Sequence, residues 1–279
     1  MKPTSLLLVL LLLQACGKNH DQPAQPSDLG KPYTLPTSPA ANSSYDASNT
    51  GVYKGVTINA QDSSATFQFN IANNSKTIYC LEYMDSVLRD SMVRYMIDPA
   101  TQLAHWPLVR DTSSTPIQSG TRFYTVFASY SPNNMGNALV PFAVEGDGSS
   151  PAMNVTLSSN QTLNAILKER SGQQVYCFEG SYEGSYYIAN DPNATDKGRV
   201  AFVVRADTAI IIMASQSHGQ FFPASGASVT GDQFTIPIID NAYGVEYIYT
   251  CSISGNTCSG TWTRPATGDT GTFTAHRTL

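Results

Sequence analysis

Charged side chains are scarce in this chain of 279 residues. Asp, Glu, Lys and Arg make up 13% of it, which is about half of their usual share in globular proteins. The balance is acidic, with a formal net charge of -5 at pH 7, and Lys and Arg form no run anywhere in the sequence. A protein that binds nucleic acid needs basic patches that neutralise phosphates, so this composition excludes nucleic acid as a partner.

Sequence signatures of catalysis are also missing. The chain contains no Gly-x-Ser-x-Gly, His-Glu-x-x-His or Walker phosphate loop, and no Cys-x-x-Cys pair that would indicate zinc. The oxygen-rich segment 191–198 has Asp196 where a calcium loop of the EF-hand type has Gly, and Phe202 where that loop has Glu. We therefore expect no metal, no cofactor and no enzymatic activity.

Long apolar runs are missing beyond the N-terminus. The run at that end, Leu6 to Leu13, contains eight residues and follows a single cation, Lys2. A transmembrane helix needs about 20 apolar residues, whereas a cation followed by a short apolar segment is typical of a signal peptide. We therefore interpret residues 1–15 as a signal peptide that is removed.

The end of this leader, Leu13-Gln14-Ala15-Cys16, resembles the lipobox of bacterial lipoproteins. The resemblance implies that Cys16 begins the mature chain and carries acyl chains that anchor it in a membrane. An Asp after the lipid cysteine tends to retain Gram-negative lipoproteins in the inner membrane. Because Gly17 stands there, the resemblance implies the outer membrane and leaves its periplasmic or surface face open. The alternative is an ordinary secretory signal with Cys16 as a free thiol.

Residues 16–50 contain almost nothing apolar to bury. Ser, Asn, Asp, Gln and Ala surround five prolines in this segment: Pro23, Pro26, Pro32, Pro36 and Pro39. Such a composition predicts a disordered tether between the lipidated cysteine and the folded body.

Four further cysteines follow the tether: Cys80, Cys177, Cys251 and Cys258. An even number of cysteines in an exported chain predicts disulfides. Cys251 and Cys258 flank the turn residues Gly255-Asn256, so we expect them to pair across a tight hairpin. Cys80 and Cys177 then pair by elimination.

From Gly51 onwards the chain alternates apolar and polar residues in short runs, which is typical of half-buried strands. We predict an all-β fold, an antiparallel barrel or sandwich. The residues at 85–99 also fit a helical stripe, but Asp98-Pro99 favours a turn between two strands. In the first half of the body, strands are expected at 51–58, 65–71, 77–83, 92–97, 103–108, 123–130, 138–144, 153–157, 163–168 and 175–177.

A weak internal repeat divides the body. Residues 180–184 (Gly-Ser-Tyr-Glu-Gly) echo residues 51–55 (Gly-Val-Tyr-Lys-Gly), which suggests two β modules, 51–178 and 179–279. One fused double sheet is the alternative. Closely spaced strands in the second module indicate a small antiparallel barrel or sandwich, and they are expected at 199–204, 208–214, 233–239, 245–252, 258–263 and 271–277.

The closing strands, 259–263 and 271–277, resemble the last strands of small up-and-down barrels of the calycin kind. The resemblance implies a barrel that binds a small ligand or a glycan. Exposed aromatic rings stack on sugars and contact protein partners, although tyrosine also packs commonly inside sheets. The candidate ligand-binding residues are Tyr182, Tyr186, Tyr247 and Tyr249.

The sequence thus favours a non-enzymatic lipoprotein of the bacterial cell envelope with a binding or structural role. It contacts the membrane through its lipid anchor, and its further partner is a glycan, a lipid or an envelope protein. A calycin-like binder of small ligands or glycans is the second hypothesis. The third is an exported hydrolase whose catalytic residues converge only in three dimensions.

Overall fold

The computed structural model describes residues 41–59, 64–73, 78–84, 86–95, 101, 111, 118–119, 122–129, 139–155, 162–185, 194–217, 219, 221–240 and 245–279. These residues form 17 strands and one short 3-10 helix, η1 (Ser43–Tyr45). All the strands belong to two antiparallel sheets, so the predicted all-β class is confirmed. No helix within the described ranges has the length and apolar character to cross a bilayer.

The first nine strands form an N-terminal sheet in the order β8-β7-β6-β4-β3-β2-β1-β9, with β5 paired to β6. The two edge strands meet, because the Thr162 hydroxyl donates to the Val155 carbonyl and the Val155 N–H donates to Asn164 Oδ1 at 3.4 Å. The sheet is therefore barrel-like. Its strands are β1 (Gly51–Asn59), β2 (Ser64–Ile71), β3 (Ile78–Met84), β4 (Val87–Tyr95), β5 (Gln118–Ser119), β6 (Arg122–Ser129), β7 (Leu139–Glu145), β8 (Ala152–Met153) and β9 (Thr162–Lys168).

The last eight strands close into a second barrel, in which each strand pairs with the next and β10 pairs with β17. This meander is the topology that the C-terminal resemblance implies. The predicted module boundary after residue 178 falls inside its first strand. The strands are β10 (Tyr176–Ser185), β11 (Thr195–Arg205), β12 (Thr208–Ser215), β13 (Phe221–Thr230), β14 (Gln233–Asp240), β15 (Val245–Ser254), β16 (Thr257–Arg264) and β17 (Asp269–Arg277).

The strand favoured at 92–97 is confirmed as part of β4, while β5 and β13 had no counterpart among the expected strands. The segment at 85–99 contains strand β4 and not the alternative helix, because β4 pairs with both β3 and β6. The partner predicted for it at 103–108 lies outside the described residues. β13 was not expected at all, since Pro223 and Gly226 interrupt its apolar pattern.

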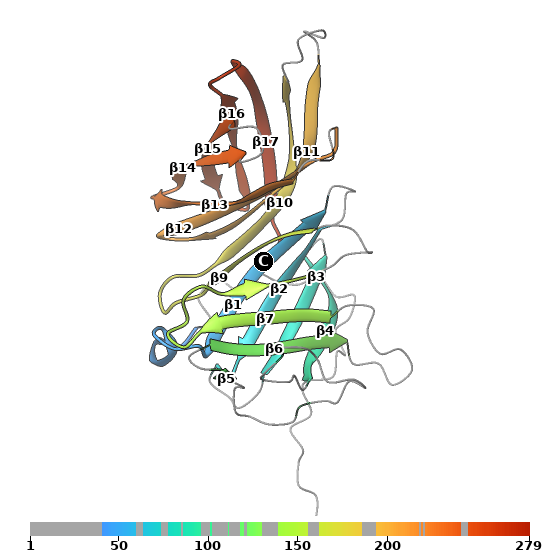
Figure 1. Cartoon of the computed structure of the whole chain (residues 1–279). Coiled ribbons are helices and arrows are strands. Elements are labelled where there is room, and N and C mark those ends of the chain that lie inside the picture. Colours follow the sequence, from blue (N-terminus) through green and yellow to red (C-terminus); the bar gives the residue numbers. More distant parts are fainter. Residues whose placement is uncertain are drawn as a thin grey trace, which may run out of the picture.

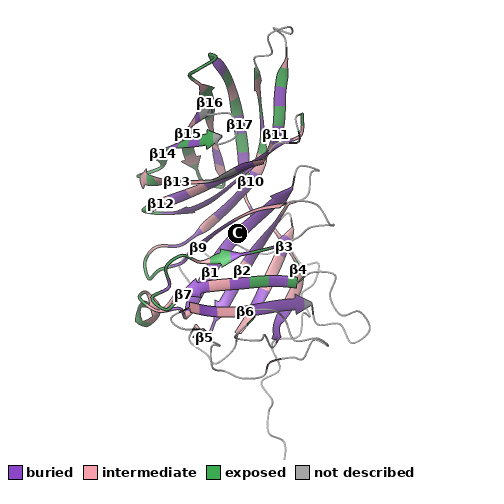
Figure 2. Cartoon of the chain, in the orientation of Figure 1, coloured by how far each residue is buried: buried purple, intermediate pink, exposed green. Residues whose placement is uncertain are grey.

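The N-terminal sheet packs against the outside of the barrel (Figure 1). Val56 and Ile58 of β1 share a buried cluster with Val203 of β11 and with the C-terminal Leu279. Figure 2 shows that β1 is buried along its whole length, as expected for a strand covered on both faces. The sheet interior and the barrel interior form two further cores.

A buried ion pair lies where the two units meet. Lys54 Nζ is 2.7 Å from Glu169 Oε2, and both side chains are fully inaccessible to solvent. Lys54 also donates to the Val175 carbonyl at 3.2 Å, and Glu169 accepts from the Val175 N–H at 3.2 Å. The segment between β9 and β10 is thereby fixed to β1.

The same junction holds residues 41–50, which the sequence assigned to the tether. Glu169 Oε1 accepts from the Ala41 N–H at 3.2 Å. Lys168 Nζ donates to the carbonyls of Tyr45, Asp46 and Ser48 around η1. This part of the predicted tether is therefore docked on the body, while residues 16–40 lie outside the described ranges.

The four cysteines are free thiols, contrary to the two predicted disulfides. Cys80 points into the core of the N-terminal sheet, whereas Cys177 belongs to the cluster between the sheet and the barrel. The predicted Cys80–Cys177 pair is therefore wrong, because the fold holds the two thiols in different cores. Cys251 and Cys258 do lie together inside the barrel, where their thiols are hydrogen-bonded to each other.

Candidate functional site

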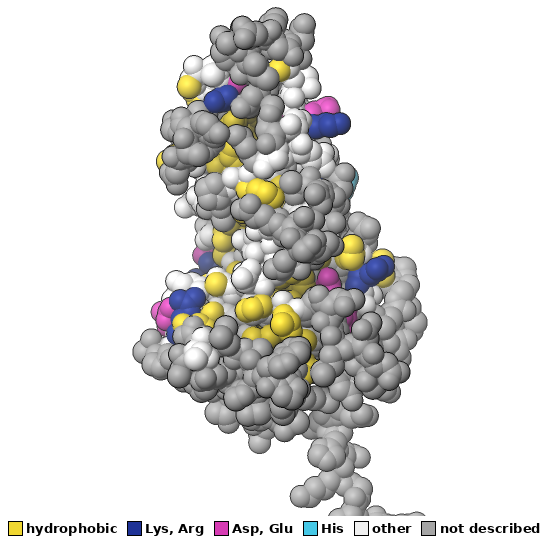
Figure 3. Space-filling view, turned by 45° about the vertical axis from the view of Figure 1, so that its right-hand side comes forward, with side chains coloured by type: hydrophobic (Ala, Val, Ile, Leu, Met, Phe, Trp, Pro, Cys, Tyr) yellow, Lys and Arg dark blue, Asp and Glu magenta, His cyan; other side chains and the backbone are white. Residues whose placement is uncertain are grey.

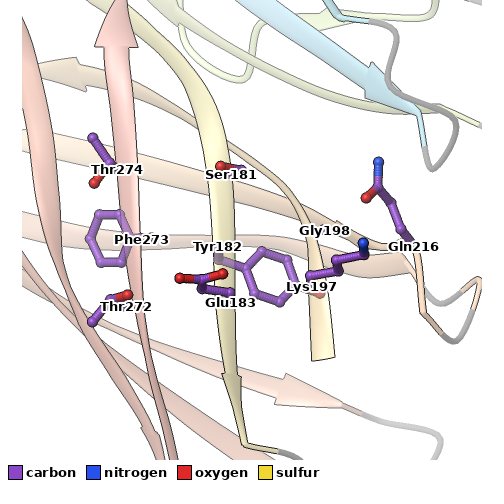
Figure 4. A pocket seen from close by; sticks show the side chains of 9 residues that line it. All are labelled: Ser181, Tyr182, Glu183, Lys197, Gly198, Gln216, Thr272, Phe273 and Thr274. Atoms are coloured by element: carbon purple, nitrogen blue, oxygen red, sulfur yellow. The ribbon is translucent and has the colours of Figure 1, made fainter. Parts of the chain in front are cut away.

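A cavity of about 280 Å³ opens on the outer wall of the barrel (Figure 4). It lies over the neighbouring strands β10, β11 and β17. Its side chains are mostly polar, with one acid and one base: Ser181, Glu183, Lys197, Gln216, Thr272 and Thr274.

Strand alternation places these polar groups on the outside. Ser181 and Glu183 are exposed, while Tyr182 between them is buried, and Thr272 and Thr274 flank the buried Phe273 in the same way. The register then sets the neighbours, because Glu183 lies opposite Lys197 on one side and Thr272 on the other. Three strands thus bring together hydroxyl, carboxylate and ammonium groups that are far apart in sequence.

The cavity adjoins a surface made almost entirely of hydroxyl side chains. None of the outward-facing side chains described on β15, β16 and β17 belongs to Asp, Glu, Lys or Arg. On the face of the molecule shown in Figure 3, the coloured Lys, Arg, Asp and Glu side chains lie in separate small groups. We name this surface the hydroxyl wall, and it consists of Thr250, Ser252, Ser259, Thr261, Thr263, Thr270, Thr272 and Thr274.

A row of threonines in register begins on β14, crosses the hydroxyl wall and follows the curve of the barrel. Thr235 of β14 lies opposite Thr250, Thr250 opposite Thr261, and Thr261 opposite Thr272. Neighbouring strands are about 4.8 Å apart, so the row repeats a methyl and a hydroxyl group at that interval. It continues through Glu183 into the cavity.

Behind the wall, one end of the barrel interior carries a hydrogen-bonded carboxylate. Tyr182 donates to Asp196 Oδ2 at 3.1 Å, and Ser215 donates to Asp196 Oδ1 at 2.7 Å. All three side chains are buried. They stand at the end where β10 leads to β11, β12 to β13 and β14 to β15.

Three of the four predicted ligand-binding tyrosines meet at this end of the barrel. Tyr182, Tyr247 and Tyr249 surround Trp262, with ring centroids 6.4, 5.9 and 6.5 Å from the indole. Their rings are inside the barrel, however, and at most 6% of any of these tyrosines is exposed. They therefore do not form the solvent-facing platform that sugar stacking requires. Tyr186 lies outside the described residues.

Burial controls the ionisation of this cluster. Desolvation raises the pKa of Tyr182 well above its usual range, and the nearby Asp196 carboxylate adds to the rise. Desolvation likewise raises the pKa of Tyr249. Both phenols therefore stay protonated at physiological pH and act as neutral hydrogen-bonding groups.

Two polar atoms of the cluster have no hydrogen-bond partner in the part of the chain that the structure describes. They are the Tyr249 hydroxyl and the Trp262 Nε1 donor. Both residues are almost completely buried, at 0% and 1% exposure. A buried donor without a partner costs about 1–3 kcal/mol, so this end of the barrel interior has unused hydrogen-bonding capacity.

The sequence analysis missed the hydroxyl wall, Asp196 and Ser215. The wall has a sequence signal, since threonine recurs at every second position in 261–263 and 270–274. Asp196 and Ser215 have none, because they approach Tyr182 only through the register in which β10 pairs with β11 and β11 with β12. No cluster of His, Cys, Asp or Glu suited to hold a metal occurs within the described ranges.

No protein-family model matches the chain, and no curated protein sequence is similar to it. Among solved structures, one described as the crystal structure of a surface lipoprotein aligns with 81% of this chain and 98% of its own chain. The sequence identity is 10% and the TM-score is 0.30. A similarity at this level assigns no function to the chain.

Proposed function

We propose that this chain is a non-enzymatic lipoprotein of the bacterial outer membrane, held by acyl chains on Cys16, and that its C-terminal barrel binds a partner. The observation that carries the proposal is the order of the segments along the chain. A leader ending in Leu13-Gln14-Ala15-Cys16 comes first, a Pro-rich segment follows, and residues 41–50 are then docked on the body. Each part has the place that a lipid-anchored protein needs.

The position of the docked segment supports a binding role for the barrel. η1 lies beside the N-terminal sheet at its junction with the barrel, whereas the ends of β10 and β11 lie at the far end of the barrel (Figure 1). The far end of the barrel is therefore remote from the docked segment. A binding surface there is held away from the point where the tether reaches the body.

Substitution of Cys16 tests the anchor. In cells fed an alkyne-labelled palmitate, the wild-type protein should take up label and fractionate with outer membranes. Cys16→Ala should remove the label and release the protein from the membrane fraction, and Ser27→Ala in the tether serves as the control. Recovery of the wild-type protein without lipid in the soluble periplasmic fraction would contradict the proposal.

Protease shaving of intact cells then tests which face of the outer membrane carries the body. The Pro-rich segment before residue 41 should be cleaved wherever protease reaches it. Loss of the body from whole cells indicates surface display, and survival until the outer membrane is opened indicates the periplasmic face. Turnover of ester, peptide or glycoside substrates by the purified protein would favour the exported hydrolase instead.

A second candidate function is the binding of a small ligand inside the barrel. The unpaired Tyr249 hydroxyl and Trp262 Nε1, close to Tyr182, favour it. A ligand that binds only the folded state raises the melting temperature, and one at this position should also change the fluorescence of Trp262. A panel of small polar and aromatic compounds that changes neither property would rule out this function.

A further inference from the structure

We propose that the hydroxyl wall and the adjoining cavity bind a neutral polysaccharide. The inference deepens the proposed function, because it names the class of partner that the barrel binds. It does not depend on the lipid anchor, since the wall belongs to the folded body.

Charge is the first argument. Lys, Arg, Asp and Glu are mostly exposed in folded proteins, yet none of the outward-facing side chains that the structure describes on β15, β16 and β17 belongs to them. A surface without cations does not attract the phosphates of nucleic acids or anionic lipids. A ligand whose own groups are uncharged hydroxyls loses no ionic hydration when it binds there.

The repeat of the wall is the second argument. The row Thr235, Thr250, Thr261 and Thr272 presents a hydroxyl and a methyl group on each strand, about 4.8 Å apart. A polysaccharide also repeats hydroxyl groups and C–H faces along its chain, once per sugar unit. Thr hydroxyls both donate and accept hydrogen bonds, so each can pair with a sugar hydroxyl in either sense.

The row of threonines ends at the cavity. Thr272 is both the last threonine of the row and a lining residue of the cavity, where it faces Glu183. Figure 4 shows Glu183, Lys197 and Gln216 placed around this space. Charge-assisted hydrogen bonds from such groups are stronger than neutral ones, so the cavity suits a terminal sugar while the wall holds the rest of the chain.

The barrel also argues against a peptide as the occupant. Peptides commonly add a strand to a free sheet edge, but each of the three strands of the hydroxyl wall is paired on both sides. The wall is rigid as well, because Tyr249, Trp262 and Phe273 pack behind it in the core. A pre-ordered surface loses little conformational entropy on binding.

Valine substitutions in the row test the inference. The triple variant Thr250→Val, Thr261→Val, Thr272→Val removes three hydroxyls with little change in shape or strand propensity. The matched control, Ser228→Val with Thr230→Val, changes exposed hydroxyl residues on β13, outside the wall. All proteins carry Cys16→Ala and are otherwise full chains, so a failure of lipidation does not affect the result.

The measurement is affinity electrophoresis in native gels that contain dextran, laminarin or glycol chitin. We expect at least one of these neutral polymers to retard the parent protein and the control, with an affinity that high salt does not change. The triple variant should bind at least about tenfold more weakly. An unchanged melting temperature shows that it is folded.

Three results would overturn the inference. They are no retardation of the parent by any of the neutral polymers, equal retardation of parent and triple variant, and retardation by anionic alginate that salt abolishes. None of these outcomes bears on the palmitate labelling of Cys16, so the inference and the proposed anchoring can fail separately.

Discussion

The buried pair of Lys54 and Glu169 is the residue-scale feature on which the two-unit architecture depends most. Each charge is fully removed from water and lies 2.7 Å from the other. Removing one partner of such a pair leaves an uncompensated charge in the interior. We expect Glu169→Gln and Lys54→Met each to lower the free energy of unfolding by about 3–5 kcal/mol, measured by urea denaturation.

The double variant tests whether Lys54 and Glu169 stabilise the fold as a pair. Lys54→Met with Glu169→Gln leaves no unpaired charge, so it should cost clearly less than the sum of the two single substitutions. Glu145→Gln is the control, since the Arg122–Glu145 pair has 31% and 32% of its side chains exposed and should contribute under about 1 kcal/mol. Additive costs in the double variant would show that the pair does not act as a unit.

At the scale of elements, β10 and β17 pass very close to the indole ring of Trp262. A Cβ at Gly271 of β17 would lie 2.3 Å from Trp262 Nε1 and 2.2 Å from the Glu183 carbonyl. Gly184, its partner on β10, would meet the same indole at 2.4 Å. The strands can therefore curve past Trp262 only where side chains are missing.

Gly271→Ala should consequently destabilise the barrel by about 1–3 kcal/mol, because the new methyl group overpacks the core. Gly226→Ala on β13 is the matched control, since a Cβ there meets only the Ala209 carbonyl, at 3.6 Å. Thermal unfolding of both variants gives the comparison. Equal melting temperatures would mean that Trp262 moves aside without cost.

Alternation predicted most of the strands, because it depends only on which residues neighbour each other in sequence. It could not predict β13, in which Gly226 pairs with Ile210 of β12 and Pro223 falls at a shift in the register. It placed Tyr247 and Tyr249 on one face of a strand. Alternation cannot say whether that face points inward, and barrel closure turned both rings into the core.

At the scale of the whole molecule, the sheet and the barrel share one buried interface, and ionisable groups are buried in all three cores. Desolvation raises the pKa values of the thiols of Cys80, Cys177 and Cys251. Thiols of the unfolded chain ionise above about pH 8.5. The unfolded state then binds fewer protons than the folded state, so stability should fall as pH rises beyond that value.

Lys168 opposes this trend over a limited range. Burial lowers its pKa to about 8, against about 10.4 in an unfolded chain. Between these values the unfolded state holds the extra proton, so this residue adds stability as pH rises. One lysine offsets only part of the effect of three thiols, so stability should already fall with rising pH at about pH 8.5.

Above pH 10 the buried tyrosines dominate, and Tyr249 allows their effect to be measured singly. Its hydroxyl is buried and has no hydrogen-bond partner among the described residues, so Tyr249→Phe should raise the free energy of unfolding by about 1–3 kcal/mol at pH 7. Burial raises the pKa of Tyr249 in the folded state, whereas the unfolded phenol ionises near pH 10 and stabilises the unfolded chain.

Phenylalanine cannot ionise. The wild-type protein therefore loses stability when the unfolded phenol ionises, and the variant does not. Relative to its own difference at pH 7, Tyr249→Phe should gain about 1.4 kcal/mol over the wild-type protein at pH 11, measured by urea denaturation at both pH values. No relative gain at pH 11 would mean that Tyr249 ionises in the folded barrel. That outcome would require water at the Trp262 end of the core, and it would favour the interior of the barrel as a ligand site.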